Sequence, residues 1–287
     1  MTKILVTGAN GQLGQSFQSL AEQFSNFEFI FTDLPEMDLC DIEKLQHYFK
    51  SNTIDFVINC AAYTAVDRAE EEVEKAKEIN AGVVNNLCEL AKIHPFRLVH
   101  FSTDYVFDGS AATPYLEEDL TQPIGVYGKT KEAGEKLILN AGLDAWIIRT
   151  SWLFSPYGKN FVKTILSLLQ NKNEIEVVAD QTGSPTYAPD LAQFVLKAIT
   201  QNPNFKGTAI YHFTNAGTTT WYDFALAIKK QINADCIINR VDSRYFTKQA
   251  PRPKYSVLNC EKIKKEFNLN PRRWESALKD CLNSIKH

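Results

Sequence analysis

Short apolar runs and longer amphipathic stretches alternate along the first half of the chain. The runs typical of buried strands are KILVT, FEFIF, DFVIN, FRLVHF and AWIIRT, at 3–7, 27–31, 55–59, 96–101 and 145–150. Patterns of helical period lie at about 11–24, 41–51 and 72–93, and a further helix carries Tyr127. This alternation predicts an α/β fold, a doubly wound parallel sheet with helices on both faces.

The regular alternation of apolar runs and amphipathic stretches becomes less clear after Thr150, where loops such as SPTYAPD and KQAPRPKYS become frequent. We therefore expect a first domain over 1–150 and a smaller α/β domain over 151–287. The second domain is expected either to follow the first or to interleave with it.

Composition and charge narrow the function classes. The 287 residues are 44% hydrophobic and 23% charged, near the average of soluble proteins, and the formal net charge is −3. This balance gives no electrostatic reason to expect nucleic acid or an anionic membrane as a partner. The start MTKILVTGANG has too short an apolar run for a signal peptide, and no later run approaches membrane-spanning length. We expect a soluble cytoplasmic protein.

The six cysteines are scattered and form no Cys-x-x-Cys pair. Several stand in apolar runs, as Cys60 does in FVINCAA. This pattern favours free buried thiols in a reducing compartment over a zinc site.

Three glycines follow the first predicted strand. Gly8, Gly11 and Gly14 stand three apart in TGANGQLGQ, at a strand-to-helix turn. Glycine lets the backbone approach a ligand, and a helix start attracts a pyrophosphate. A bare tight turn is the alternative. Asp33, 19 residues after Gly14, favours the ligand, because a carboxylate there typically holds the adenosine ribose of a dinucleotide.

These features predict a Rossmann-type sheet that binds NAD or NADP. The charge of Asp33 argues for NADH because it repels the 2′-phosphate of NADPH, without settling the choice. Asp38 has two interpretations: it could cap the helix near 41, or it could approach the adenine.

The fourth predicted strand ends in HFSTDYVFDG. Ligands bind at the carboxyl ends of parallel strands, so we expect Ser102, Thr103 and Asp104 to project into the cofactor crevice. A hydroxyl such as that of Thr103 can hydrogen-bond a carbonyl oxygen and stabilise developing charge. A plain turn is the alternative.

Tyr127 and Lys131 stand one helical turn apart in IGVYGKTKEAGEK, between the fourth and fifth strands. A free phenol, with a pKa near 10, is too weak an acid for rapid proton donation to a ketone oxygen. A nearby ammonium favours the phenolate and lowers that pKa. The pair therefore predicts a proton source, against the alternative of an exposed surface pair. The Lys–Glu pattern from Glu132 to Lys136 predicts a solvated helix face.

Together these motifs resemble the extended short-chain dehydrogenases/reductases. The matching stretches, in the family's order, are TGANGQLG, NCAAYTAVDRAE, EINAGVVNNL, FSTDYVFDG and YGKTK, and RTSWLF, DQTGSPTYAPDLA and RPKYSVLN extend the resemblance to about residue 259. The most similar members reduce the C4 ketone of dTDP-4-dehydro-L-rhamnose to dTDP-L-rhamnose for cell-surface polysaccharide biosynthesis. The resemblance thus implies NADPH or NADH as cofactor and a nucleotide-sugar substrate. A reductase or epimerase of another nucleotide-sugar, and a non-catalytic cofactor-binding regulatory subunit, are the alternatives.

The resemblance also assigns roles to residues. It implies that Tyr127 donates the proton, that Lys131 lowers the pKa of the phenol and holds the ribose, and that Thr103 contacts the carbonyl oxygen. Asn80 resembles an asparagine that supports a proton relay, against the alternative of a solvent-facing side chain. With the glycine turn, the implied cofactor-binding positions are Gly8, Gly11, Gln12, Leu13, Gly14, Asp33, Asp38, Leu39, Ala62, Tyr63, Thr64, Tyr127 and Lys131.

Substrate contacts follow from the same resemblance. Thr103, Asp104 and Trp152 match residues that bind the sugar, although Trp152 could equally belong to the core. Arg252, in PRPKYS, is expected to pair with a diphosphate through its forked guanidinium, against the alternative of an exposed loop arginine.

Some members of the resembling family dimerise around magnesium held by glutamates near the first helix and in the second domain. Here the first helix begins GQSFQS, without acids, and the later position holds Asp190. We therefore expect no metal, and a monomer or weak homodimer. Asp190 could instead help to start the helix LAQFVLKAI.

Overall fold

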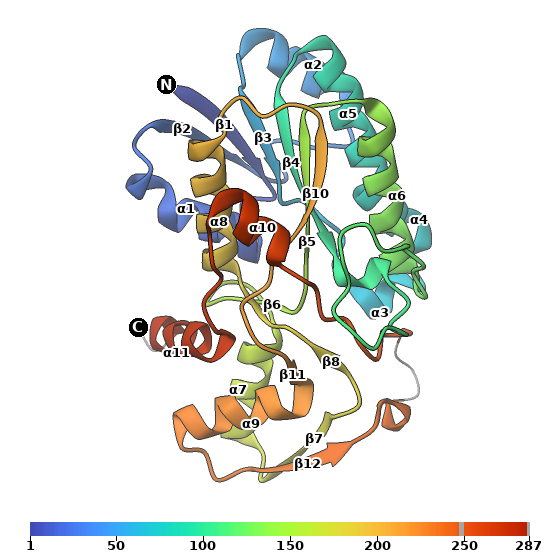
Figure 1. Ribbon diagram of the computed structural model, residues 1–287, viewed down its shortest axis with the longest axis vertical. Helices are drawn as coiled ribbons and strands as arrows, with labels where there is room; N and C mark the ends of the chain where they lie inside the picture. Colours follow the sequence, from blue (N-terminus) through green and yellow to red (C-terminus); the bar gives the residue numbers. More distant parts are fainter. Residues whose placement is uncertain (247–249, 286–287) are drawn as a thin grey trace.

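The computed structural model describes residues 1–246 and 250–285 (Figure 1). Positions 248 and 249 of the predicted loop KQAPRPKYS lie outside the described residues. A sheet with helices on both sides occupies the upper part of Figure 1, and a smaller group of helices and short strands lies below it.

The upper part is built on a six-stranded sheet in the order β10-β5-β4-β3-β1-β2. All its neighbouring strands are parallel, which confirms the predicted doubly wound sheet. The strands are β1 (Thr2–Thr7), β2 (Phe27–Thr32), β3 (Phe56–Asn59), β4 (Arg97–Thr103), β5 (Ala145–Thr150) and β10 (Thr208–His212). The strand order reverses between β1 and β3, and ligands bind at the carboxyl ends of strands at such a point.

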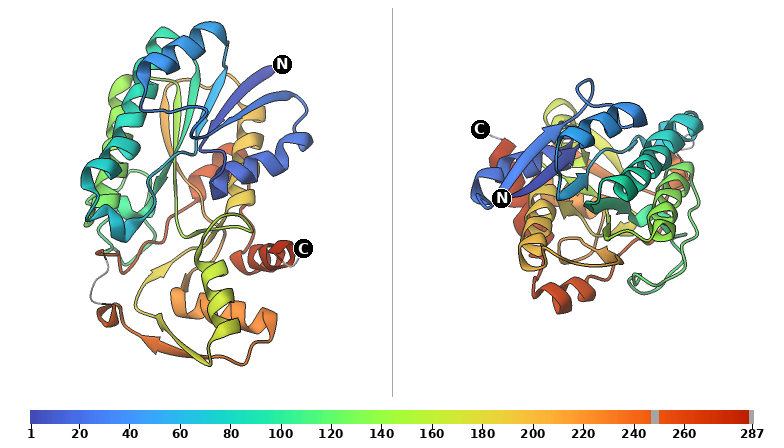
Figure 2. Two further views of the ribbon diagram at one scale, coloured as in Figure 1. Left: turned by 180° about the vertical axis from the view of Figure 1, so that it is seen from behind. Right: turned by 90° about the horizontal axis from the view of Figure 1, so that it is seen from above.

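Helices cover both faces of this sheet (Figures 1 and 2). Side chains of α1, α8 and α10 share one apolar core with one face, and side chains of α2, α5 and α6 share a second core with the other face. Ile4 and Leu5, successive residues of β1, belong to different cores because strand side chains alternate. The helices are α1 (Gln12–Leu20), α2 (Ile42–Ser51), α5 (Val83–Ile93), α6 (Val126–Ala141), α8 (Ala188–Gln201) and α10 (Glu261–Phe267).

Two predicted helices differ in detail from the structure. The first ends at Leu20, and a 3₁₀ segment, η1 (Ala21–Gln23), follows it. The helix predicted over 72–93 is α4 (Val73–Lys77), a π-helical segment η2 (Glu78–Gly82), and α5, in unbroken succession. Such π segments often occur at functional sites, and this one contains a predicted site residue.

The lower part has an apolar core of its own. In it β7 pairs with β12, β8 with β11, and β6 with β9. Their bounds are β6 (Leu153–Phe154), β7 (Glu174–Val178), β8 (Thr182–Gly183), β9 (Thr186–Tyr187), β11 (Thr219–Thr220) and β12 (Ile237–Val241). The remaining helical segments of the described chain, in the upper and lower parts together, are α3 (Val66–Ala69), η3 (Asp104–Val106), α7 (Phe161–Asn171), α9 (Trp221–Ile232), η4 (Ser243–Tyr245) and α11 (Trp274–Ile285).

The second half of the chain contributes to both parts. The strand β10, which the sequence pattern did not predict, pairs with β5 at the edge of the six-stranded sheet, and α8 packs on the same sheet. The division of the chain at residue 150 stays a prediction.

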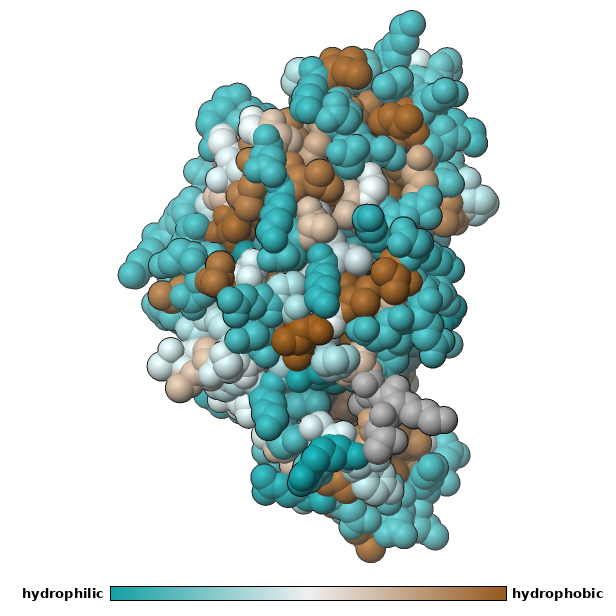
Figure 3. All heavy atoms as spheres, turned by 90° about the vertical axis from the view of Figure 1, so that its right-hand side faces the viewer, coloured by the Kyte–Doolittle hydropathy of each residue, from teal (hydrophilic) through white to brown (hydrophobic). Residues whose placement is uncertain are grey.

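The face of the molecule that Figure 3 shows is mainly hydrophilic, with separate brown apolar patches. Across residues 1–246 and 250–285, no helix is both long and apolar enough to cross a membrane. The six cysteines are free thiols. Cys88, Cys236 and Cys281 are buried as expected, but Cys40 is exposed, so the prediction of buried thiols was wrong there.

Candidate active site

The turn after β1 packs its glycines against backbone. Gly8 has φ +62°, and a Cβ there would lie 2.6 Å from the backbone nitrogen of Ala61. A Cβ at Gly14 would lie 2.4 Å from the carbonyl oxygen of Gly8. Close packing alone therefore requires glycine at both positions.

The same turn also offers a site for a ligand. Gly11 is the N-cap residue of α1 and supplies no side-chain cap, which leaves N–H groups for an anion. A cavity of about 250 Å³ adjoins the turn. Its lining includes six of the predicted cofactor residues: Gly8, Gly11, Asp33, Asp38, Leu39 and Ala62. This combination of open helix start and cavity fits the adenosine half of a dinucleotide.

Asp33, which follows β2 directly, is held at this cavity by hydrogen bonds from backbone groups. Its Oδ2 accepts a hydrogen bond from the N–H of Asn10 at 2.8 Å, and its Oδ1 accepts one from the N–H of Leu34 at 2.8 Å. A carboxylate has about four acceptor sites, so it can still accept from ribose hydroxyls.

Asp38 lines the cavity but does not cap a helix. Its Oδ1 accepts from the N–H of Cys40 at 2.9 Å. The cap of α2 is Asp41, which accepts from the N–H of Lys44 at 3.1 Å. The interpretation of Asp38 as the cap was wrong, because the helix starts one turn later than that reading requires.

Gln12 joins the phosphate turn to the lower part of the molecule, a contact that the sequence did not reveal. Its Oε1 accepts from the hydroxyl of Ser155 and from Nδ2 of Asn160, both at 3.0 Å. Asn160 is also the N-cap of α7, since its Oδ1 accepts from the N–H of Lys163. The next residue of the turn, Leu13, is buried in the core.

Asn80 ties the loop after β3 to helix α6. Its side chain is 1% exposed, which contradicts the solvent-facing alternative. Oδ1 accepts from the N–H of Tyr63 at 2.9 Å, and Nδ2 donates to the Tyr63 carbonyl and to the Thr130 hydroxyl, both at 3.1 Å. The Thr130 hydroxyl donates in turn to the Tyr127 carbonyl at 2.9 Å. Thr64, the next residue of the loop, is exposed.

Thr103 is the last residue of β4, and Asp104 is the first residue of η3. Both are buried, and the Thr103 hydroxyl donates to Oδ1 of Asp104 at 3.0 Å. Oδ2 of Asp104 has no hydrogen-bond partner within the described part of the chain. Burial raises the pKa of Asp104 to about 7.

Tyr127 lies in the first turn of α6, partly exposed, with its ring 5.7 Å from that of Tyr105. Desolvation raises the pKa of Tyr127 to about 12, and the charge of Asp104 adds to this, while the Thr103 hydroxyl opposes it. The expected lowering of the phenol pKa is therefore not found, because burial disfavours the charged phenolate.

Lys131 is buried, and its Nζ lies 3.3 Å from Nε2 of His100 on β4. Desolvation lowers the pKa of Lys131 to about 8, and the charge of Glu135 opposes this. The sequence indicated the pair Tyr127–Lys131 but not His100, although His100 stands only three residues before Thr103.

Glu135 contradicts the predicted solvated face of α6. It is 2% exposed, and both of its oxygens accept from the guanidinium of Arg149 on β5, at 2.9 and 2.7 Å. Tyr127, Lys131 and Glu135 thus follow one another at four-residue spacing, which places them on one side of α6. Lys136 and Glu132 form an outer ion pair at 2.9 Å.

Trp152 follows β5 with φ +49°. Its ring is stacked on that of Trp221, with centroids 3.5 Å apart and planes at 8°. A Cβ on Gly183 would lie 2.6 Å from the indole. Trp152 is partly exposed, so it belongs to the edge of the lower core, and its contact with a sugar stays a prediction.

Arg252 is not an exposed loop arginine, because its side chain is only 18% exposed. Its Nη2 lies 2.9 Å from Oδ1 of Asp67, and its Nη1 donates to the Ala250 carbonyl at 3.0 Å. Its role toward a diphosphate stays a prediction.

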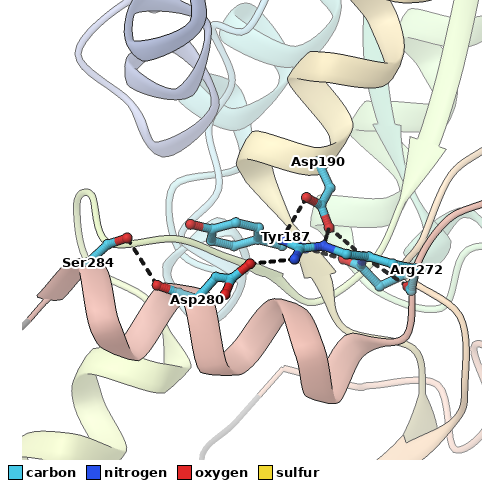
Figure 4. A network of polar contacts seen from close by, with 6 residues as sticks. Tyr187, Asp190, Arg272, Asp280 and Ser284 are labelled. Carbon is cyan, nitrogen blue, oxygen red and sulfur yellow. Dashed lines mark hydrogen bonds and ion pairs between the residues drawn. The ribbon is translucent and has the colours of Figure 1, made fainter.

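Asp190 belongs to a polar network between α8 and α11 (Figure 4). Arg272 donates to both of its oxygens, at 2.8 and 3.0 Å, and Asn215 donates to one at 2.7 Å. The N-cap of α8 is Tyr187, with Asp190 in the first turn. Within residues 1–246 and 250–285, no group of three or more His, Cys, Asp or Glu side chains could hold a metal ion.

A dinucleotide-type sheet, an open phosphate turn and a Thr–Tyr pair beside a buried lysine define a nicotinamide-nucleotide-dependent oxidoreductase. The chain belongs to the family whose model is described as the RmlD substrate binding domain, which matches residues 1–287.

Three relatives show how far the similarity extends. The chain is 41% identical to the spore coat polysaccharide biosynthesis protein SpsK of Bacillus subtilis (strain 168), over 98% of this chain and 97% of that protein. It is 40% identical to the dTDP-4-dehydrorhamnose reductase of Aggregatibacter actinomycetemcomitans, over 98% of both. The crystal structure of dTDP-4-dehydrorhamnose reductase from Bacillus anthracis str. Ames in complex with NADP is 35% identical, covers 99% of both chains and has a TM-score of 0.93.

Proposed function

We propose that this protein reduces the C4 ketone of dTDP-4-dehydro-L-rhamnose to dTDP-L-rhamnose, with NADPH or NADH as hydride donor, for cell-surface polysaccharide biosynthesis. Full-length similarity to dTDP-4-dehydrorhamnose reductases supports the substrate. The observation that carries the chemistry is the placement of Tyr127 beside Thr103 and Asp104, at the carboxyl end of β4.

The chain's own residues supply binding, orientation and a proton. The phosphate turn and Asp33 would hold the pyrophosphate and the adenosine ribose, and Lys131 would hold the nicotinamide ribose. When bound, the nicotinamide supplies the hydride for the substrate carbon. The Thr103 hydroxyl, which donates to Asp104 in this structure, would turn its hydrogen toward the substrate oxygen as negative charge develops. The Tyr127 hydroxyl would deliver its proton to that oxygen.

We further infer two roles for the substrate-side residues. Asp104, with an unpartnered Oδ2, would accept a hydrogen bond from a sugar hydroxyl. Trp152 would border the sugar, and Arg252 would leave Asp67 to bind the diphosphate.

The location and oligomeric state also belong to this proposal. Six free thiols support a reducing compartment such as the cytoplasm. A monomer or weak homodimer is supported by Asp190, whose carboxylate is already engaged by Arg272.

A product assay tests the proposed function. Purified protein is supplied with dTDP-4-keto-6-deoxyglucose and the upstream epimerase, separately with NADH and with NADPH, and the products are identified. We expect dTDP-L-rhamnose. Preferential turnover of GDP- or UDP-linked 4-keto sugars would identify a different nucleotide-sugar reductase, and failure to oxidise either cofactor would identify a non-catalytic subunit.

A further inference from the structure

A row of buried polar side chains crosses the sheet beneath α6. Thr7 of β1, Asn59 of β3 and His100 of β4 are register partners on neighbouring strands. Each is 1% exposed, as is Lys131, which continues the row from α6. The Thr7 hydroxyl donates to Asn59 Oδ1 at 2.8 Å, Asn59 Nδ2 lies 3.2 Å from His100 Nδ1, and His100 Nε2 lies 3.3 Å from Lys131 Nζ.

The chemistry of these groups determines which atom donates and which accepts in each hydrogen bond of the row. The backbone N–H of Ala61 can only donate, and it donates to Oδ1 of Asn59 at 3.2 Å, so the amide group of Asn59 faces His100. An amide NH₂ can only donate, so Nδ1 of His100 must accept. The proton of the neutral imidazole is then on Nε2, the nitrogen that faces Lys131. Desolvation holds the pKa of His100 well below its usual value, and a charge on Lys131 lowers it further, so the ring is neutral in either state of the lysine.

The Nε2–H of His100 therefore points at the lysine nitrogen. An ammonium group has three donors and no acceptor, whereas a neutral amine has a lone pair that can accept this hydrogen. The arrangement is satisfied only by the neutral amine. We propose that His100, held in one tautomer by Asn59, is a positioning residue that favours the neutral form of Lys131 and thereby sets the pH at which the lysine becomes charged.

Titratable and charged groups of α6 and β5 also bear on the protonation of Lys131. Tyr127 and Glu135 stand four residues to either side of Lys131 on α6. Glu135 favours the ammonium, and its carboxylate also accepts two hydrogen bonds from Arg149 of β5. The catalytic consequence rests on the proposed function: a charged lysine assists the phenol, so reduction should decline as pH rises through the lysine pKa.

The tautomer is tested first, without any activity measurement. Full-length protein labelled with ¹⁵N-histidine is studied by long-range ¹H–¹⁵N NMR, with the His100 signals identified by their loss in His100→Gln. We expect the Nε2–H tautomer from pH 6 to 8. In Asn59→Asp, an acceptor replaces the amide, so the proton should move to Nδ1. A wild-type ring with the proton on Nδ1, or on both nitrogens, would overturn the proposal.

A pH profile then tests the effect on the lysine. In Asn59→Asp the unprotonated Nε2 would accept from the ammonium, so the alkaline limb of kcat/KM should move upward by about one pH unit. The same substitution is repeated in the His100→Gln background, where the shift should shrink to less than about half. An undiminished shift in that background would mean direct action of the new charge and would overturn the role of His100. If the wild-type protein reduces no substrate, the proposed function fails, and the tautomer still decides this inference.

Discussion

The carboxyl group of Asp104 is the residue-scale feature with the clearest consequence for pH. It is 2% exposed, and its pKa is raised by burial to about 7, above the value near 3.8 for a free aspartate. The folded state therefore holds this proton more tightly than the unfolded state. The resulting contribution to stability is complete below pH 4 and is lost as pH rises through 7.

We predict that Asp104→Asn gains thermal stability relative to wild type as pH increases. The amide has nearly the same shape and no charge, so it avoids the cost of burying a carboxylate. The difference in melting temperature between variant and wild type, measured at pH 5 and pH 8, should be larger at pH 8. A difference that is equal at both pH values would contradict the assigned protonation.

Single residues divide clearly into those that sequence could reveal and those that it could not. Tyr127, Thr103 and Asp33 could be predicted because each follows from a strand end or a helical spacing. The partner of Lys131 could not, because the direction of its amine depends on His100, which reaches it across a strand–helix contact.

Helix α6 is the element that holds the site together, and it does so through close backbone contacts. A Cβ at Gly134 would lie 2.5 Å from the carbonyl oxygen of Asn80, in η2. The buried pair Glu135–Arg149 joins the same helix to β5. The sequence did not predict this contact, because repeated Lys and Glu residues are typical of a solvated helix face. The partner, Arg149, lies on a strand and is distant in sequence.

We predict that Gly134→Ala destabilises the protein by about 1–3 kcal/mol and lowers turnover, because the added methyl forces α6 away from η2. Gly82→Ala is the matched control. Its new Cβ would have only the side chain of Glu78 within 4 Å, at 3.9 Å, so it should be neutral or stabilising. Urea unfolding and steady-state kinetics measure both. Equal stability of the two variants would contradict the packing argument.

At the scale of the whole molecule, the phosphate turn is connected to the lower part through Gln12. The alternation of strands and helices was sufficient to predict the sheet from β1 to β5. It could not predict β10 or the contacts of Ser155 and Asn160, because these join segments far apart in sequence and leave no local periodic signal. For the second half of the chain, the sequence predicted the function in more detail than the helices and strands. The reason is that recognisable motifs stand in its loops, whereas many of its strands are too short to show a periodic pattern.

We predict that Ser155→Ala raises the KM for the nicotinamide cofactor by about 2- to 10-fold with little change in kcat, the cost expected for losing the hydrogen bond to Gln12. The substitution also removes the hydrogen bond that the Tyr157 N–H donates to Ser155. The loss would loosen Gln12 at the cofactor site without touching the reacting atoms. Ser19→Ala, which removes a hydroxyl that donates to the Ser16 carbonyl within α1, serves as control. A fall in kcat with unchanged KM would contradict this role.

The most direct test of the account is the turnover of Tyr127→Phe with the dTDP-4-keto sugar, beside the control Tyr48→Phe, whose ring lies on α2 at the edge of the second core. If Tyr127 delivers the proton, its loss should reduce kcat by about 10²- to 10⁴-fold while cofactor affinity stays within about twofold. Tyr48→Phe should turn over normally. Near-normal turnover of Tyr127→Phe would contradict the central claim.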